Sequence, residues 1–240
     1  EMPALGADNG LALVSMIGAD YDDPQWDTLL DQLTFNEMVN TITLGFHNTA
    51  AIESIGKTRT KDENGPQGLT AALTGGASAM CYTSEDVMAA TFNVDLINDV
   101  GRCIGEDCLA MGYSGLYGPG INMHRTAYSG RNFEYYASDP FVAGTICAAE
   151  VNGIQSKGVY VYLKHVALND SESSRRGVNT WLNEQAAREI YLEVADKAIT
   201  DGGAWSVMTG FNRWGATWCG ANANLLTGFL RGELGMRGMC

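Results

Sequence analysis

Short apolar runs that end in polar residues alternate with longer helical patterns through much of the 240-residue chain, and this alternation restricts the fold more than any other feature. Repeated alternation of strand and helix favours a parallel sheet with right-handed crossovers. We therefore predict an α/β fold whose ligands bind at the carboxyl ends of the strands. The predicted strands cover residues 115–121, 159–168 and 205–211.

Amphipathic periodicity and capping residues define the predicted helices. Residues 24–45 predict one amphipathic helix. Residues 84–112 predict a long, mostly helical stretch that Gly101 and Gly105 weaken. Asp139, followed by a proline, is a strong helix start. The remaining helices are predicted at residues 140–157, 183–200 and 222–234, each followed closely by a glycine that stops it.

The number of strand–helix units indicates whether the chain forms a whole barrel. Counting from about residue 54, the sequence predicts roughly five or six units, whereas a closed (β/α)8 barrel has eight. Residues 236–240 predict the start of a further strand. We therefore predict one domain over residues 1–240, an incomplete TIM-type (β/α)8 barrel that lacks its last strands, in a chain that is a fragment of a longer protein.

Charge and composition argue against several classes of partner. The net charge is −13, and a surface of that sign repels phosphate backbones and anionic lipid, so nucleic-acid binding and membrane contact are not expected. No run approaches the roughly 20 apolar residues that a membrane-spanning helix needs. The six cysteines form no C-x-x-C pair and the three histidines no H-E-x-x-H motif, so we expect reduced thiols and no metal site. No targeting segment is recognisable, and the compartment stays undetermined.

Polar side chains gather where the predicted strands end. Lys164 and His165 have three interpretations: a surface pair, two donors that hold hydroxyls or a carboxylate in a pocket, or a Schiff-base lysine with its neighbour. Arg131 lies in a loop dense in aromatic residues, and its guanidinium can bridge carboxylates or sugar hydroxyls. Asn64 precedes a Gly-Pro pair, which predicts a turn. The polar clusters occupy residues 122–125, 164–165 and 212–213.

Eight sequence blocks occur in an order that a known family shares. They are NGPQGL at 64–69, GPGINMHR at 118–125, GRNFEYYASDP at 130–140, GIQSKGV at 153–159, KH at 164–165 followed by Asn169, REIYL at 188–192, VMTGFN at 207–212, and residues 225–235. Each block alone is weak evidence, but their common order is specific. Together they resemble family 3 glycoside hydrolases of the β-glucosidase type, over nearly the whole chain from about Trp26 to Cys240.

The resemblance implies a retaining exo-glycosidase that hydrolyses terminal β-linked glucosyl or similar residues of oligosaccharides or glycosides. It implies a carbohydrate substrate, no metal and no cofactor, and further domains in the parent chain. Most of the implied substrate-binding side chains hold sugar hydroxyls, and a methionine lines the pocket wall. These residues are Asn64, Arg131, Lys164, His165 and Met208.

The chain departs from the family pattern at two positions and lacks the catalytic carboxylates. Asn64 stands where the family normally has aspartate, and Phe211 where it often has tyrosine. The nucleophilic aspartate is expected shortly after Cys240, and the acid/base glutamate also outside these residues. We therefore expect no catalytic carboxylate in this chain and no turnover by the chain alone. The alternatives are a non-catalytic sugar-binding remnant and a Schiff-base aldolase that uses Lys164.

Overall fold

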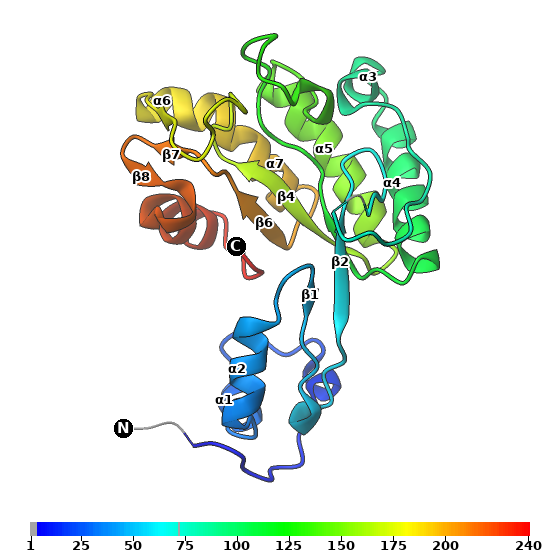
Figure 1. Ribbon diagram of the computed structural model, residues 1–240, viewed down its shortest axis with the longest axis vertical. Helices are drawn as coiled ribbons and strands as arrows, with labels where there is room; N and C mark the ends of the chain where they lie inside the picture. Colours follow the sequence, from blue (N-terminus) through cyan, green and yellow to red (C-terminus); the bar gives the residue numbers. More distant parts are fainter. Residues whose placement is uncertain (1–3, 72) are drawn as a thin grey trace. The chain divides into compact units, whose positions relative to one another are not determined.

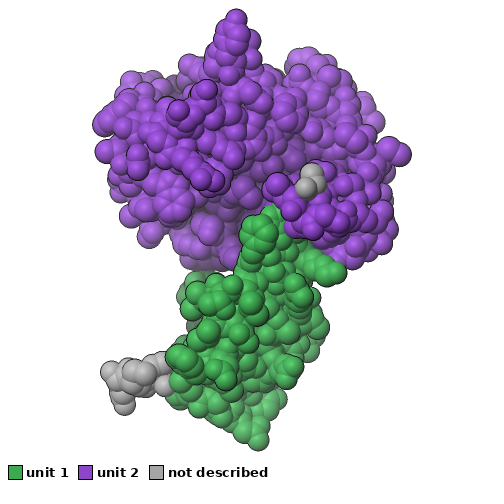
Figure 2. Space-filling view, viewed as in Figure 1, with its two compact units in different colours: residues 1–62 green, residues 63–240 purple. Residues whose placement is uncertain are grey.

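The computed structural model describes residues 4–71 and 73–240 and divides into two compact units (Figure 2). Unit 1 is Glu1–Asp62 and unit 2 is Glu63–Cys240. Among the described residues, no helix is long and apolar enough to cross a membrane. The single domain over residues 1–240 stays a prediction.

Unit 1 contains two short α-helices where the sequence predicts one. These are α1 (Gln25–Leu30) and α2 (Phe35–Thr43), so the single helix predicted over residues 24–45 was wrong. The break occurs because the side chain of Thr34 accepts a hydrogen bond from the backbone N–H of Glu37, whose side chain accepts from the backbone of Thr34. This reciprocal capping box starts a new helix at that point.

The rest of unit 1 is a short antiparallel pair and two single turns of 3-10 helix. β1 (Asn48–Thr49) pairs with the start of β2 (Thr60–Asn64), and the turns are η1 (Leu13–Met16) and η2 (Glu53–Ile55). A small apolar core stabilises this unit. It contains Met16, Leu29, Leu33, Ile52 and Ile55.

Three parallel strands form the centre of unit 2, and all three confirm predicted strands. They are β3 (Gly115–Tyr117), β4 (Tyr160–Val166) and β6 (Ser206–Thr209), in the order β3-β4-β6. The chain after the last helix returns to the edge of β6, where the Val207 N–H donates to the Met239 carbonyl at 3.0 Å. Residues 236–240 are thus bonded to β6, but the structure assigns no strand to them, so the predicted further strand is not seen in this chain.

The helices of unit 2 flank this sheet, with α5 packed between α4 and α7 (Figure 1). The predicted helices at 140–157, 183–200 and 222–234 are confirmed to within a few residues. The second and third contain π-helical segments. The elements are α3 (Glu85–Ala90), α4 (Val94–Ala110), η3 (Asn132–Glu134), α5 (Pro140–Gln155), α6 (Glu184–Ala186), η4 (Ala187–Leu192), α7 (Glu193–Thr200), η5 (Cys219–Ala221) and η6 (Asn224–Glu233), with a small second sheet of β5 (Asn179–Thr180), β7 (Arg213–Trp214) and β8 (Thr217–Trp218).

The predicted helical stretch over residues 84–112 is interrupted, but not at its glycines. The break precedes Asn93, whose side chain accepts a hydrogen bond from the Leu96 N–H and so caps α4. Gly101 and Gly105 lie inside an unbroken helix. A Cβ at Gly101 would collide with the Glu150 carbonyl of α5, so this glycine permits close packing of the two helices.

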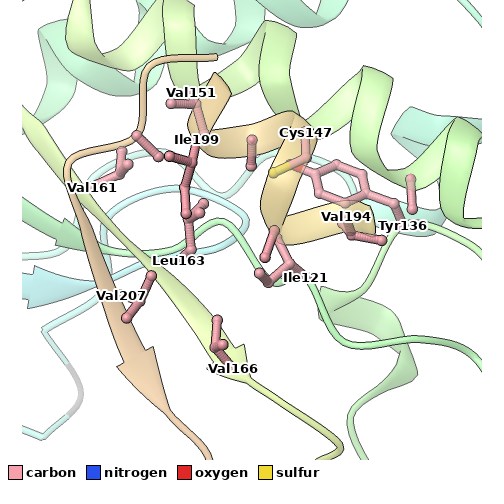
Figure 3. Close-up of a cluster of buried hydrophobic side chains, with 14 of the residues drawn as sticks. Ile121, Tyr136, Cys147, Val151, Val161, Leu163, Val166, Val194, Ile199 and Val207 are labelled. Atoms are coloured by element: carbon pink, nitrogen blue, oxygen red, sulfur yellow. The ribbon is translucent and has the colours of Figure 1, made fainter. Parts of the chain in front are cut away.

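The core of unit 2 lies between the parallel strands and the helices (Figure 3). Alternate strand residues such as Val161 and Leu163 meet side chains of α5 and α7, including Val151 and Ile199, and all are nearly inaccessible to solvent. Burial on both sides is typical of parallel sheets that helices cover. The fold is therefore the predicted α/β class, an incomplete (β/α)8 barrel, and the ends of β3, β4 and β6 define where a site can form.

Candidate functional site

The predicted site residues Arg131, Lys164 and His165 meet at the carboxyl ends of the strands. Lys164 and His165 lie near the end of β4, and Arg131 immediately precedes η3 in the loop between β3 and α5. The Arg131 Nη1 atom lies 3.0 Å from His165 Nε2. Residues 34 positions apart in sequence are thus in direct contact.

Glu134 joins these cations. Its carboxylate accepts a hydrogen bond from Arg131 Nε, and its Oε2 atom lies 3.3 Å from Lys164 Nζ. The side chains of Glu134 and Lys164 are each 4% exposed, and that of Arg131 is 20% exposed. Burial lowers the pKa of Lys164, and the negative charge of Glu134 opposes that shift. Glu134 therefore compensates two positive charges that burial would otherwise disfavour.

His165 is neutral and held in one tautomer. Arg131 is a donor only, so Nε2 of His165 accepts its hydrogen bond and Nδ1 carries the proton. Nδ1 then donates to the Tyr135 hydroxyl at 3.0 Å. Burial, followed by the charges of Arg131 and Lys164, holds the pKa of His165 well below its ordinary value. The imidazole therefore acts as an oriented neutral group.

A second layer of polar residues holds this cluster in place. Asn169 donates to the Tyr135 hydroxyl at 3.1 Å and to Glu172 Oε1 at 3.0 Å. The other Glu172 oxygen accepts from Arg175 Nη1 at 2.6 Å, and the Arg175 guanidinium lies 4.8 Å from the centre of the Phe211 ring. Phe211, one of the two departures from the family pattern, thus packs under an arginine of this layer.

The carboxylate of Asp170, the residue after Asn169, accepts hydrogen bonds from two further side chains. One oxygen accepts from Asn122 Nδ2 at 2.9 Å and the other from the Tyr191 hydroxyl at 2.6 Å. Asn122 also accepts from the Asn169 N–H at 2.8 Å. The polar residues after β3 and β4 are therefore tied to one another, as expected for the carboxyl ends of adjacent parallel strands.

Met208 lies beside Lys164, whereas the hydrogen bonds described for Asn64 go to residues outside the cluster. Met208 is the register partner of Lys164 across β4 and β6, so the two side chains leave the same face of the sheet. Among the described residues, Asn64 bonds to Glu63 and Thr70. Its loop reaches the Arg131 loop through Gln67, whose Nε2 donates to the Phe133 carbonyl at 2.8 Å.

The Asn64→Asp substitution is expected to destabilise the chain by about 1–3 kcal/mol near neutral pH. The Asn64 amide donates to Oε1 of the fully buried Glu63 at 3.2 Å, and aspartate would place a second carboxylate there. Urea unfolding near neutral pH measures the loss through the shift of the midpoint. Asn36→Asp, at an exposed position in the first turn of α2, should change stability by less than about 0.5 kcal/mol. Equal effects of both substitutions would contradict the expectation.

The side chains of this cluster are largely shielded from solvent, and a small hollow lies next to them. This hollow is lined by Ile121, Asn122, His165 and Tyr191, among others. A larger hollow of about 540 Å³ lies elsewhere, between the segment 182–192 and η6, and none of the predicted site residues lines it. The polar chemistry is at the strand ends, so we place the candidate site there rather than at the larger hollow.

The described residues contain neither a cluster of metal ligands nor a disulfide. Among residues 4–71 and 73–240, no three His, Cys, Asp or Glu side chains are arranged to hold a metal ion. All six cysteines are free, and Cys108, Cys147 and Cys219 are buried. Glu134 and Tyr135 are the residues that sequence reasoning did not single out individually. The only signal for them was their place three and four residues after Arg131 in a polar, aromatic loop.

The chain matches one family over most of its length. The sequence profile of the glycosyl hydrolase family 3 N-terminal domain matches residues 36–240. A beta-glucosidase from Rhizobium radiobacter is 35% identical over 216 residues, covering 89% of this chain and 26% of the relative. An exo-alpha-(1->6)-L-arabinopyranosidase from Bifidobacterium breve is 34% identical over 185 residues, covering 73% of this chain and 24% of the relative. The chain thus spans about a quarter of the length of these relatives.

Solved structures agree with these matches. The crystal structure of a beta-glucosidase from Paenibacillus barengoltzii superposes with a TM-score of 0.85 at 30% identity, covering 99% of this chain and 27% of that one. A beta-glucosidase from Thermotoga neapolitana in complex with alpha-D-glucose has a TM-score of 0.80 at 30% identity, covering 90% of this chain and 34% of that one. These likenesses confirm the predicted fold class and the resemblance found in the sequence.

Proposed function

The chain belongs to glycosyl hydrolase family 3, and from this we propose that the protein to which it contributes is a retaining exo-glycosidase. We propose terminal β-linked glucosyl or similar residues of oligosaccharides or glycosides as its substrates. The observation that carries the proposal is the meeting of Arg131, Lys164 and His165 around one buried carboxylate. The two cations provide hydrogen-bond donors suited to the hydroxyls of a neutral sugar, and the neutral imidazole of His165 orients Arg131 beside them.

The arrangement supports catalysis through hydrogen bonds that strengthen as the sugar ring flattens. In glycoside hydrolysis the transition state resembles an oxocarbenium ion, and tighter contacts to ring hydroxyls lower the barrier. Arg131 and Lys164 are donors already fixed by Glu134, so they need little reorganisation when substrate binds. Rigid positioning of this kind favours a pocket that grips one terminal sugar.

We further propose that the nucleophile and the acid/base come from outside these 240 residues. Retaining hydrolysis uses two carboxyl groups about 5–5.5 Å apart, one of which must be free to attack the anomeric carbon. In the described site, Glu134 is engaged by Arg131 and Lys164, and Glu172 and Asp170 each have donors at both oxygens. These carboxylates are suited to supporting the pocket rather than to nucleophilic attack.

The preferred sugar is a separate part of the proposal. Relatives of this chain are named both as beta-glucosidases and as an arabinopyranosidase. We place β-glucosides first because beta-glucosidases recur among the matched sequences and structures. Comparing hydrolysis of aryl β-glucosides and aryl α-L-arabinopyranosides by the complete protein tests this choice directly.

In the complete protein, Lys164→Met is expected to lower kcat/KM for an aryl β-glucoside by about 100-fold or more, because a charged donor to the sugar is lost. Methionine keeps much of the lysine stem volume, and Glu134 retains Arg131 as a partner. Lys61→Met, at an exposed lysine, is the matched control and should leave kcat/KM within about twofold. An unchanged rate in Lys164→Met would exclude the proposed role of this residue.

The same experiments separate the two alternatives. A sugar-binding remnant would bind a glucose-type inhibitor without turnover in the complete protein. A Schiff-base aldolase needs a neutral Lys164 amine, and borohydride with a carbonyl substrate would then trap a covalent adduct. Burial lowers the pKa of Lys164, as a Schiff-base lysine requires, but its ammonium is paired with Glu134, and this ion pair supports hydroxyl binding over Schiff-base chemistry.

A further inference from the structure

Two acidic side chains lie fully buried behind the candidate site and take no part in the proposed reaction. Glu85 belongs to α3 and Glu150 to α5, and both residues are 0% exposed. Acidic residues are almost never buried completely unless they are paired. Helix α3 packs against α5, which places these acids in neighbouring layers of the same core.

Each acid uses one oxygen and leaves the other without a partner. Glu85 Oε1 accepts the Gly120 N–H at 3.0 Å, and Glu150 Oε2 accepts the Tyr136 hydroxyl at 2.6 Å. Among the described residues, Glu85 Oε2 and Glu150 Oε1 are buried without any hydrogen-bond partner. A buried carboxylate oxygen with no donor is costly, and a proton on the group removes most of that cost.

The surrounding charges favour retention of a proton. Burial and then the charge of Glu150 raise the pKa of Glu85 well above its ordinary value, and the Gly120 N–H opposes that shift. Glu134 of η3 also raises the pKa of Glu85, whereas Lys164 of β4 lowers it. Burial raises the pKa of Glu150 to about 7, against the effect of the Tyr136 hydroxyl.

Two other titratable groups, Cys147 and Tyr136, interact electrostatically with this pair. Cys147, on α5, has a pKa raised well above its ordinary value, first by burial and then by the charges of Glu150 and Glu85. Tyr136 is also kept protonated, because burial and the same two carboxyls raise its pKa. Neither group supplies a positive charge to the acids. Lys164, the cation that acts on Glu85, is already paired with Glu134, so a proton is the remaining means of neutralising the pair.

The pair is connected to the candidate site through the backbone of Gly120. An isolated parallel β-bridge pairs Gly120 with Lys164. The two neighbours of Gly120 make the hydrogen bonds of this bridge: the Lys164 N–H donates to the Pro119 carbonyl at 3.0 Å, and the Ile121 N–H donates to the Lys164 carbonyl. A Cβ at Gly120 would collide with the Glu134 carbonyl. The Gly120 peptide thus lies between Glu85 and the two residues that form the buried ion pair of the site.

We propose that Glu85 and Glu150 are positioning residues, a buried acid pair that retains one proton at neutral pH and, through the Gly120 N–H, fixes the backbone that carries Lys164. The role in sugar binding rests on the proposed function, whereas the retained proton and the Gly120 bond do not. Because both acids have a raised pKa in the folded protein, that protein binds more protons than the unfolded chain between about pH 4.5 and 7. Its stability therefore falls as the pH rises through that range.

The first test detects the proton without reference to activity. Infrared spectra of the complete protein near neutral pH are expected to contain a buried carboxylic-acid C=O band that weakens as the pH rises through about 7. Glu150→Gln should remove or shift this band, and Asp95→Asn, at an exposed position in the first turn of α4, should leave it unchanged. A spectrum without such a band, or a band unaffected by both Glu150→Gln and Glu85→Gln, would overturn the proposal.

The second test follows the Gly120 peptide. Hydrogen exchange of a peptide spanning residues 118–123 should be faster in Glu85→Ala, roughly tenfold for loss of one buried hydrogen bond. Glu85→Gln should retain slow exchange, because its amide oxygen can still accept the Gly120 N–H. Equal exchange in wild type and Glu85→Ala would refute the anchoring role, and if Glu85→Ala fails to fold, the Glu150→Gln measurements still decide whether the pair exists.

The third test asks whether the pair positions the sugar site. In the complete protein, the affinity for a glucose-type inhibitor should fall about tenfold in Glu85→Ala and should fall in wild type as the pH rises above about 7. Glu150→Gln should abolish that pH-dependent fall, and Asp95→Asn should keep it. An identical pH profile in wild type and Glu150→Gln would overturn the positioning role. Failure of all forms to bind the inhibitor would instead reject the proposed function, while the infrared and exchange results stand separately.

Discussion

Replacing Glu134 with leucine is expected to destabilise the folded chain by about 3–5 kcal/mol, because it leaves two cations without their shared buried counter-ion. Lys164 is the more affected of the two, since its side chain is 4% exposed and its ammonium lies 3.3 Å from the carboxylate. Arg131 keeps a contact to Glu172 at 3.8 Å and is partly exposed. Urea unfolding of wild type and variant measures the difference through the shift of the midpoint.

Glu184→Leu is the matched control for this prediction. Glu184 also pairs with an arginine, Arg188, but its side chain is 78% exposed and Glu233 holds the same guanidinium. Exposed ion pairs contribute roughly 0–1 kcal/mol, so this variant should unfold almost like wild type. A Glu134→Leu variant that loses less than about 1 kcal/mol would show that the buried cluster is not held together by this carboxylate.

The 240-residue chain alone is expected to show no detectable turnover of an aryl β-glucoside, whereas the complete protein should hydrolyse it. Removing a nucleophile that acts as part of a catalytic unit typically lowers kcat by about 10⁴–10⁶-fold. In the complete protein, a 2-fluoro glucoside should trap a glycosyl-enzyme whose modified peptide lies outside residues 1–240. Mass mapping of that peptide is the decisive measurement.

Two controls make this prediction specific. Circular dichroism must show that the isolated chain is folded, so that absence of turnover reflects missing groups rather than unfolding. The complete protein with Asp170→Asn should still form the trapped intermediate, because Asp170 is engaged by Asn122 and Tyr191. A labelled peptide within residues 1–240, or hydrolysis by the isolated chain, would show that the nucleophile has been misplaced.

The strands and most helices followed from sequence because their signals are local. Apolar runs ended near the boundaries of β3, β4 and β6, and caps such as Asp139 started helices where predicted. The errors came from caps that were overlooked within apparently continuous patterns. Thr34 and Asn93 each start a new helix, since a side-chain acceptor satisfies backbone N–H groups there. Helical periodicity on both sides of such a cap hides the break.

The candidate site was only partly predictable from sequence. Arg131, Lys164 and His165 were identified as polar residues near strand ends, and the structure brings them together. Asn64 was grouped with them through the family resemblance, and in the structure its amide bonds to Glu63. Contact between side chains that are distant in sequence depends on how the strand-end loops pack, which periodicity does not report.

The sequence by itself determined the parallel α/β fold, the order of its elements and the cationic residues at its strand ends. Periodic burial and capping act over a few residues, so a single sequence carries them. Only the tertiary structure decided the tautomer of His165, the counter-ion of Lys164 and the burial of Glu85 beside Glu150. These depend on desolvation and on charges brought within a few ångströms by packing, and both effects exist only once the chain has folded.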